Sequence, residues 1–179
     1  MEASARFGVM LMRYVKIDSI VEDGRHKGYS LDADPYLAVL PEILQYLPSG
    51  ARAFASDRDH YNFFGRKCVK DLKLSRTLLI DARNHLSATF EFEPYQFKHD
   101  LGLVIYYDGV IEMSVSATES EEATLPGAKR LGYLQLDETL PHERGFSHEI
   151  QFTGGSLWIV ARELSFEWRD ILPAEGISA

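Results

Sequence analysis

Two carboxylates and an imidazole lie close together in one polar segment of the chain, at Asp57, Asp59 and His60. In a loop, these side chains are suitable ligands for Mg²⁺, Mn²⁺ or Zn²⁺, and His85 or His99 are candidates to complete the set. Acidic pairs in loops also hydrogen-bond to their own backbone in solvated turns. Because nothing in the spacing fixes a coordination geometry, we predict the solvated turn, with no metal ion and no cofactor.

A second candidate is His148, which falls on the apolar side of an alternating segment. A buried imidazole can act as a general base when its surroundings tune its pKa. The competing interpretation, which we favour, is a core histidine that is hydrogen-bonded to a neighbour. Arg162 likewise interrupts an apolar run, and we expect it to pair with Glu149 or to reach the surface rather than to hold an anion.

The sequence contains none of the familiar catalytic motifs. There is no GxSxG, P-loop, GxGxxG, CxxC or HExxH pattern. Gly154-Gly155-Ser156 looks like a nucleophile turn, but it lies between two predicted strands and not between a strand and a helix. We therefore predict no catalytic residue and favour a protein that is not an enzyme.

Composition predicts one acidic domain over residues 1–179. The chain has a formal net charge of -8, a pI of about 5.2 and 45% hydrophobic residues, which suffice for a core. Cys68 is the only cysteine, so no internal disulfide can form. No apolar run matches a signal peptide or a membrane span. We expect a cytoplasmic protein that does not associate with a membrane.

The charge distribution makes nucleic acid an unfavourable partner and favours a basic protein. The one basic cluster is formed by Arg66, Lys67, Lys70 and Lys73. An acidic surface would speed the encounter with a basic partner. The acidic connection that contains Glu119, Glu121 and Glu122 is expected to be exposed and to contribute to that surface.

Aromatic residues gather in the same polar segment, at Tyr61, Phe63 and Phe64. They would either anchor this loop against the helical segment or form an exposed hot spot, since aromatic side chains dominate such patches. The candidate binding residues are Asp57, Asp59, His60, Tyr61, Phe64, Glu119, Glu121 and Glu122.

Residues 146–168 predict a β-hairpin around Gly154-Gly155, because a two-residue turn requires positive φ angles that glycine accepts. Pairing through that turn places one row of residues on a common face: Phe146, His148, Ile150, Phe152, Leu157, Ile159 and Ala161. The second arm is apolar on both faces near the turn, which predicts a central strand that is covered on both sides.

The N-terminal part of the chain predicts a first strand over 8–18, a polar loop over 22–30 and a helical segment over 34–56. Asp34 is a suitable N-cap. Pro41 predicts a kink, or a fresh helix that starts there.

The rest of the chain predicts antiparallel β structure over 69–168, followed by a tail over 169–179. Asp108-Gly109 is a strong signal for a second hairpin turn. One further strand is expected to end at Leu136.

These segments predict a strand-dominated α+β fold. We expect about eight mostly antiparallel strands in a sandwich or a strongly curved sheet. One Pro-kinked, N-terminal helical segment would cover a face or an end of it.

Two functions are compatible with these features. The first is a non-catalytic intracellular protein that recognises another macromolecule through an acidic surface; toxin-neutralising immunity proteins offer a comparison of type. The alternative is a small-ligand-binding or metal-dependent hydrolytic β domain that uses Asp57, Asp59, His60 or His148. Convergence of these residues in a concave site would favour the alternative. We favour the first function because motifs for the second are missing.

Overall fold

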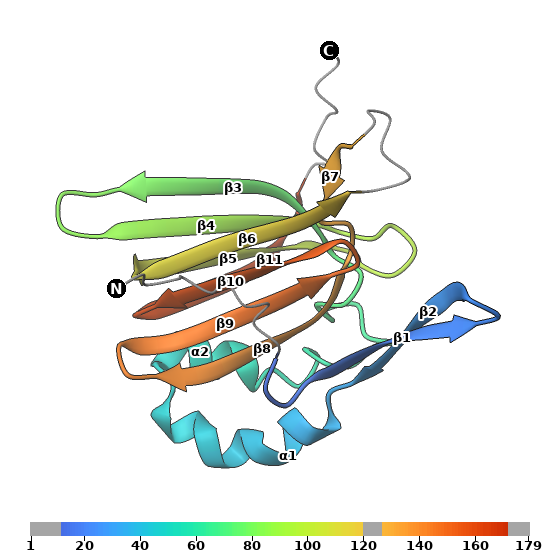
Figure 1. Ribbon diagram of the computed structural model, residues 1–179. Helices are drawn as coiled ribbons and strands as arrows, with labels where there is room; N and C mark the ends of the chain where they lie inside the picture. Colours follow the sequence, from blue (N-terminus) through green and yellow to red (C-terminus); the bar gives the residue numbers. More distant parts are fainter. Residues whose placement is uncertain (1–11, 120–126, 172–179) are drawn as a thin grey trace, which may run out of the picture.

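The computed structural model describes residues 12–119 and 127–171, which form a strand-dominated α+β fold with antiparallel sheets and two α-helices (Figure 1). In chain order the elements are β1 (Lys16–Glu22), β2 (Arg25–Asp32), α1 (Asp34–Ile43), the 3-10 helix η1 (Leu44–Tyr46), α2 (Ser49–Ala55), β3 (Lys73–Asp81), β4 (Leu86–Glu93), β5 (Gly102–Val110), β6 (Glu112–Glu119), β7 (Lys129–Arg130), β8 (Leu134–His142), β9 (Gly145–Phe152), β10 (Gly155–Ala161) and β11 (Glu163–Arg169). None of the described helices is long and apolar enough to cross a membrane.

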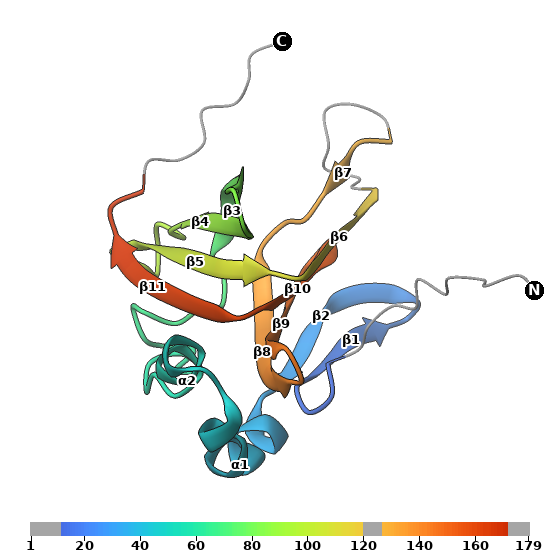
Figure 2. The same cartoon turned by 90° about the vertical axis from the view of Figure 1, so that its left-hand side faces the viewer.

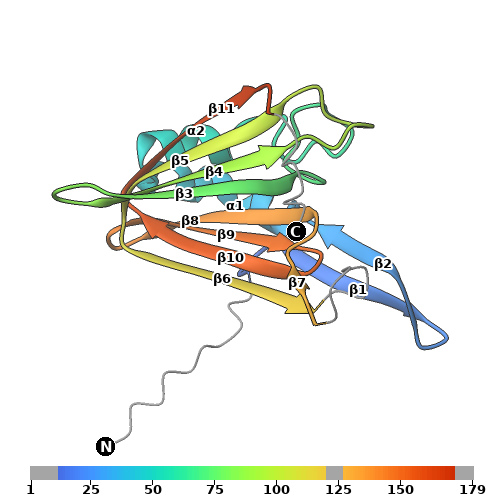
Figure 3. The ribbon, with the colours of Figure 1, turned by 90° about the horizontal axis from the view of Figure 1, so that it is seen from above.

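Two sheets face each other and are joined by bent strands. One has the order β7-β6-β10-β9-β8 and the other β11-β5-β4-β3. The chain passes from β5 into β6 at Ile111, and from β10 into β11 at Arg162, so both crossings lie at one corner (Figure 3). Together the two sheets form a curled half-barrel, which confirms the predicted strongly curved sheet.

The predicted hairpin at Asp108-Gly109 is wrong, because these residues form the corner itself. Arg162 donates its backbone N–H to the carbonyl oxygens of Asp108 and Gly109, at 3.1 and 3.2 Å. Gly109 has a φ of 62°. A glycine in this left-handed region bends a strand without a steric penalty, so the chain changes sheet here instead of turning back.

The hairpin that the N-terminal sequence actually forms was not predicted. Strands β1 and β2 pair around Asp23 and Gly24, whose φ angles are 49° and 72°. Two positive φ angles are typical of the tight turn that favours Asp-Gly. Most of the polar loop expected over 22–30 is therefore strand β2. Of the first strand expected over 8–18, residues 16–18 belong to β1, residues 12–15 are not in a strand, and residues 8–11 lie outside the described part.

The β9–β10 hairpin confirms the predicted faces but corrects the turn. Phe152 pairs with Gly155, so the turn is Thr153-Gly154, and the pairing moves by two residues. A shift of two preserves the alternation, so every residue of the predicted face is buried. Neither Gly154 nor Gly155 has a positive φ. A Cβ on Gly155 would lie 2.1 Å from the Ser116 carbonyl oxygen, so close backbone contact requires glycine there.

The helical segment packs at one end of the half-barrel (Figure 2). Helix α1 continues through Pro41 to Ile43, so no fresh helix starts at the proline. The N-cap is Ala33 and not the predicted Asp34. Helix α2 lies against β11, and its Phe54 enters the core next to Phe166, with the ring centroids 5.1 Å apart.

One carboxylate fixes α2 onto β11. Glu163 accepts hydrogen bonds from the backbone N–H groups of Gly50 and Ala51, at 3.0 and 3.3 Å, and from the Ser49 hydroxyl at 3.0 Å. These bonds satisfy the free N–H groups of the first helical turn. A Cβ on Gly50 would lie only 1.7 Å from the Leu164 carbonyl oxygen.

This contact predicts an inverted effect for Gly50→Ala. In an ordinary helix this change stabilises by up to about 1 kcal/mol, because alanine has the higher helix propensity. Here the methyl group would push α2 off β11, and we expect a loss of about 1–3 kcal/mol in the free energy of unfolding, measured by urea denaturation. The control is the reverse change on the exposed side of the same helix, Ala53→Gly, which measures the effect of helix propensity alone on the free energy of unfolding. A Gly50→Ala variant that is more stable than the wild type would contradict the close contact with β11.

Candidate functional site

A buried carboxylate, Asp137 on β8, joins the two histidines that the sequence singled out. His60 Nε2 lies 2.7 Å from Asp137 Oδ1, and His148 Nε2 lies 2.7 Å from Asp137 Oδ2. All three side chains are almost completely buried. The Tyr107 hydroxyl lies 2.7 Å from His148 Nδ1 and extends the chain of hydrogen bonds to β5.

The electrostatics of this group keep Asp137 ionised. Burial by itself would raise the pKa of Asp137, but the charge of His60 and the hydrogen bonds from both imidazoles outweigh it and hold that pKa well below its usual range. An ionised carboxylate only accepts, so both Nε2 atoms must carry hydrogen. Burial raises the pKa of Tyr107, so its hydroxyl keeps its proton.

This buried group supports the fold, and each of its three side chains is at most 3% exposed. The three depressions described below are not lined by His60, Asp137 or His148. His148 is therefore the core histidine that the sequence favoured, hydrogen-bonded to its neighbours on both ring nitrogens. Arg162 is exposed at the corner between the sheets, as expected, and reaches the surface.

The ligands of the alternative metal site do not come together. Asp57 Oδ1 accepts the backbone N–H of Asp59 at 2.9 Å, which makes the predicted local turn, whereas His60 points inward to Asp137. His85 instead pairs with Asp108, and His99 binds the Cys68 carbonyl oxygen. Within residues 12–119 and 127–171, no group of three or more histidine, cysteine or acidic side chains is arranged to hold a metal.

Two anchors fix the loop that follows Asp57. At the first, His60 binds Asp137 and the Tyr61 hydroxyl donates to the Asp137 carbonyl oxygen at 2.7 Å. At the second, Asp71 donates its backbone N–H to the Leu134 carbonyl oxygen at 2.8 Å, which ties the loop to β8. The backbone N–H of Val69 also reaches the His60 carbonyl oxygen at 3.3 Å and closes the loop on itself.

Phe64 is held out into solvent by these anchors. Its side chain is 99% exposed, whereas Tyr61 and Phe63 pack against the core. The three aromatic residues thus divide between the two predicted roles: Tyr61 and Phe63 anchor the loop, and Phe64 projects from it. Cys68 is fully buried at the second anchor, and this burial raises the pKa of its thiol, which makes it a structural cysteine.

Phe64 belongs to a larger group of exposed aromatic side chains, which we call the aromatic surface. It consists of Tyr29, Phe64, Tyr95, Phe97 and Tyr133. The ring of Tyr95 lies 5.5 Å from that of Phe97 and 5.8 Å from that of Tyr133, centroid to centroid. Phe97 is 79% exposed and shares a depression of about 550 Å³ with Phe64. Contiguous exposed apolar groups of this kind often mark interaction sites.

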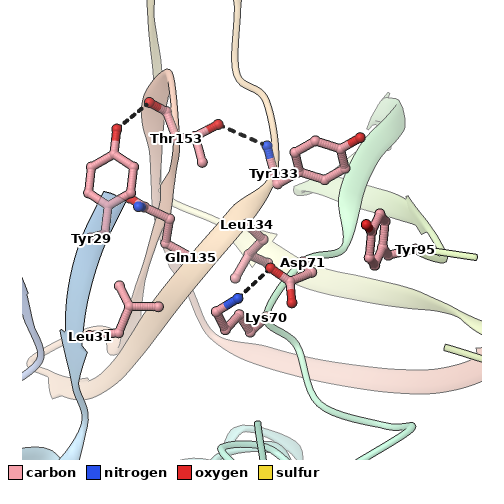
Figure 4. A pocket seen from close by; sticks show the side chains of 9 residues that line it. All are labelled: Tyr29, Leu31, Lys70, Asp71, Tyr95, Tyr133, Leu134, Gln135 and Thr153. Carbon is pink, nitrogen blue, oxygen red and sulfur yellow. Dashed lines mark hydrogen bonds and ion pairs between the residues drawn. The ribbon is translucent and has the colours of Figure 1, made fainter. Parts of the chain in front are cut away.

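A second depression, of about 510 Å³, is lined by the three tyrosines of this surface (Figure 4). Its floor contains Gln135, which is only 6% exposed and whose side-chain amide has no hydrogen-bond partner among the described residues. The β8–β9 pairing skips from Leu134 to Leu136, so Gln135 is the extra residue of a β-bulge. Bulges redirect side chains, and this one leaves an amide donor and acceptor available inside the depression.

The charges around the aromatic surface differ on its two sides. A third depression, of about 340 Å³, runs from Phe64 to Leu31 and is lined by the carboxylates of Asp32 and Asp34 with no basic residue. On the other side, Arg66 pairs with Asp100 across an exposed contact. The acidic side therefore offers a place for a cationic group beside an exposed aromatic ring.

A pair of carboxylates lies on the outer face of the five-stranded sheet. Glu138 pairs directly with Glu149 across β8 and β9. Glu138 accepts the backbone N–H groups of Arg13, Tyr14 and Val15, at 2.6, 2.7 and 3.2 Å. Burial raises the pKa of Glu149 to about 7, and the charge of Glu138 acts in the same direction, against a hydrogen bond from Gln151.

Sequence reasoning missed Asp137, Gln135 and the Glu138–Glu149 pair, because the expected strand ended at Leu136 and these residues follow or interrupt it. Of the acidic connection, Glu119 ends β6, while Glu121 and Glu122 lie outside the described residues. Their role in binding stays a prediction.

Comparisons with protein families, with curated proteins and with solved structures found no match to this chain. The interpretation of the site rests on its geometry and chemistry.

Replacing Asp137 with Asn should destabilise the protein strongly. The substitution removes the charge that both imidazoles bind, and breaking a buried ion pair costs about 3–5 kcal/mol. We expect a decrease of this size in the free energy of unfolding at pH 7, measured by urea denaturation. Asp100→Asn, which breaks a solvent-screened pair at the surface, should change it far less. Equal effects of the two changes would rule out the structural role of Asp137.

Glu149→Gln should stabilise the protein in a pH-dependent manner. A glutamate carboxyl in the unfolded chain has a pKa of about 4.3. Between this pH and about 7 only the folded state keeps the proton, so the free energy of unfolding falls as the pH rises. Glutamine does not ionise, so the Glu149→Gln variant avoids this loss of stability at high pH. We expect a gain on the order of 1–3 kcal/mol at pH 8 and none at pH 4, measured by urea denaturation.

The control for this measurement is Glu42→Gln on the exposed side of α1, which should change stability by less than about 0.5 kcal/mol at either pH. A Glu149→Gln gain that is the same at pH 4 and pH 8 would show that Glu149 does not titrate in this window.

Proposed function

We propose that this protein is a non-catalytic recognition domain whose aromatic surface binds another protein. The observation that carries the proposal is Phe64, an almost fully solvated aromatic side chain on a loop with two buried anchors. A flexible loop would lose conformational freedom on binding, whereas an anchored one is already ordered. Interfaces concentrate their binding energy in such aromatic residues.

The surroundings of Phe64 favour a partner segment that is basic and partly apolar. Asp32 and Asp34 line the depression on one side of Phe64, where a lysine or arginine of the partner would find a carboxylate and an aromatic face. The Gln135 amide in the tyrosine-lined depression would satisfy a polar group of the partner. The chain's net charge of -8 would speed the encounter with a basic protein.

A toxin-neutralising, immunity-like role is one function of this type. It requires a compact acidic protein that occupies a basic partner without chemistry of its own. The acidic connection with Glu119, Glu121 and Glu122 would form a second contact in such a complex. The small-ligand or hydrolytic alternative receives no support from Asp57, Asp59, His60 and His148, because these side chains do not converge on any of the three depressions.

The test is capture of the partner by matched variants. The wild-type chain, Phe64→Ser and Tyr46→Ser would each be mixed at low salt with lysate of the source cell, and the bound fraction analysed by native mass spectrometry. Tyr46 is an exposed aromatic residue on η1, outside the aromatic surface, and serves as the control.

We expect a stoichiometric polypeptide with the wild type and with Tyr46→Ser. With Phe64→Ser its affinity should fall by about 30-fold or more, because hot-spot side chains contribute about 2 kcal/mol or more. Equal capture by all three chains would contradict the proposal. A bound small molecule or metal without a polypeptide would favour the alternative function.

A further inference from the structure

Strand β3 presents an apolar, unpaired edge at the outside of the four-stranded sheet. Among the described residues it pairs along its length with β4 alone, apart from one bridge between Lys73 at its start and Tyr133, and the sheet order ends with it. Leu78, Leu79 and Ile80 are 51%, 47% and 49% exposed, although they are consecutive residues of one strand. The β3–β4 hairpin also extends beyond the neighbouring strands (Figure 1). Exposed edges of this kind are normally blunted by charges or covered, because they pair with other chains.

The direction of the backbone groups on this edge follows from the hairpin. Ala82 donates its N–H to the His85 carbonyl oxygen at 3.0 Å and so forms the first hydrogen-bonded pair. Such pairs alternate along an antiparallel ladder, so Leu78 and Ile80 direct their N–H and C=O groups toward β4. Thr77 and Leu79, as well as Asp81, direct theirs outward, where none of the described residues pairs with them.

We propose that β3 pairs antiparallel with β3 of a second copy of this chain, around a two-fold axis at Leu79. In an antiparallel ladder, outward-directed residues must face outward-directed residues. A two-fold register is therefore centred on a residue and not between two. The register centred on Leu79 places Leu79 opposite its own copy, Leu78 opposite Ile80, and Thr77 opposite Asp81.

Only this register pairs the three apolar residues with one another. An axis at Leu78 would place Ile80 opposite Arg76 and Leu79 opposite Thr77. An axis at Ile80 would place Leu79 opposite Asp81. The Leu79 register opposes no like charges, and the Thr77 hydroxyl can donate to the Asp81 carboxylate of the second copy.

The second copy is the occupant that fits best because the edge is complementary to itself. The uncharged stretch Thr77–Ile80 is bounded by Arg76 and Asp81, and the two-fold axis lies within that stretch. Arg76 would face Ala82 of the second copy and keep its contact with Glu91 at 3.3 Å. None of these residues belongs to the aromatic surface, so this pairing is independent of the proposed function.

Cysteine cross-linking tests the register. In a hydrogen-bonded pair the Cα atoms lie about 5.5 Å apart, which is within the range of a disulfide. Leu79→Cys should therefore form an intermolecular disulfide under mild oxidation. Leu78→Cys would lie diagonally from its copy, at about 7–8 Å or more, and should not. The natural Cys68 is fully buried, and the unmodified chain should remain uncross-linked.

Sedimentation equilibrium tests the assembly itself. We expect a dimer whose dissociation constant rises ~10-fold or more in Leu79→Lys, since two lysines would then oppose each other at the axis. Leu37→Lys, an equally exposed leucine on α1, should leave the constant unchanged. Circular dichroism confirms that each variant is folded.

A wild-type chain that stays monomeric to ~100 µM would overturn the proposal. Equal cross-linking of Leu78→Cys and Leu79→Cys, or open-ended aggregation in place of a dimer, would also overturn it.

Discussion

The buried carboxylate of Asp137, held between His60 and His148, is the interaction on which the rest of the structure depends. An isolated carboxylate at this depth would be strongly unfavourable, and two imidazole hydrogen bonds of 2.7 Å offset that cost. Asp137 and His148 lie on the neighbouring strands β8 and β9, whereas His60 comes from a loop 77 residues before Asp137. The hydrogen bonds between the Asp137 carboxylate and the two imidazoles hold the loop on the sheet. Because these polar groups satisfy one another, they can occupy the core.

The exposed surface follows from this buried group. His60 and Tyr61 are both bonded to Asp137, and Phe63 still packs against the core. The chain is buried again at Cys68, and the backbone N–H of Asp71 bonds it to β8. Phe64 lies between these two fixed points and projects into solvent. A buried group of two imidazoles and a carboxylate thus positions Phe64, the residue that we propose for binding.

The alternation of β9 and β10 was enough to predict which residues are buried, because a two-residue change of register keeps the faces. Turns were less predictable: Asp23-Gly24 forms a hairpin turn, whereas the same dipeptide at Asp108-Gly109 forms a corner between sheets. Local sequence cannot distinguish the two Asp-Gly turns, since the difference depends on which strand, distant in the sequence, pairs beside each of them. The partnership of His60 with Asp137 was hidden for the same reason.

Amide hydrogen exchange at Val69, whose N–H binds the His60 carbonyl oxygen, tests most directly whether the loop is anchored. If the anchors hold as described, this amide should exchange only through near-global unfolding, with an opening free energy within about 1 kcal/mol of the global value. An opening free energy several kcal/mol lower would show that the loop detaches on its own. Phe64 would then belong to a flexible segment, and the account of a preorganised binding surface would be wrong.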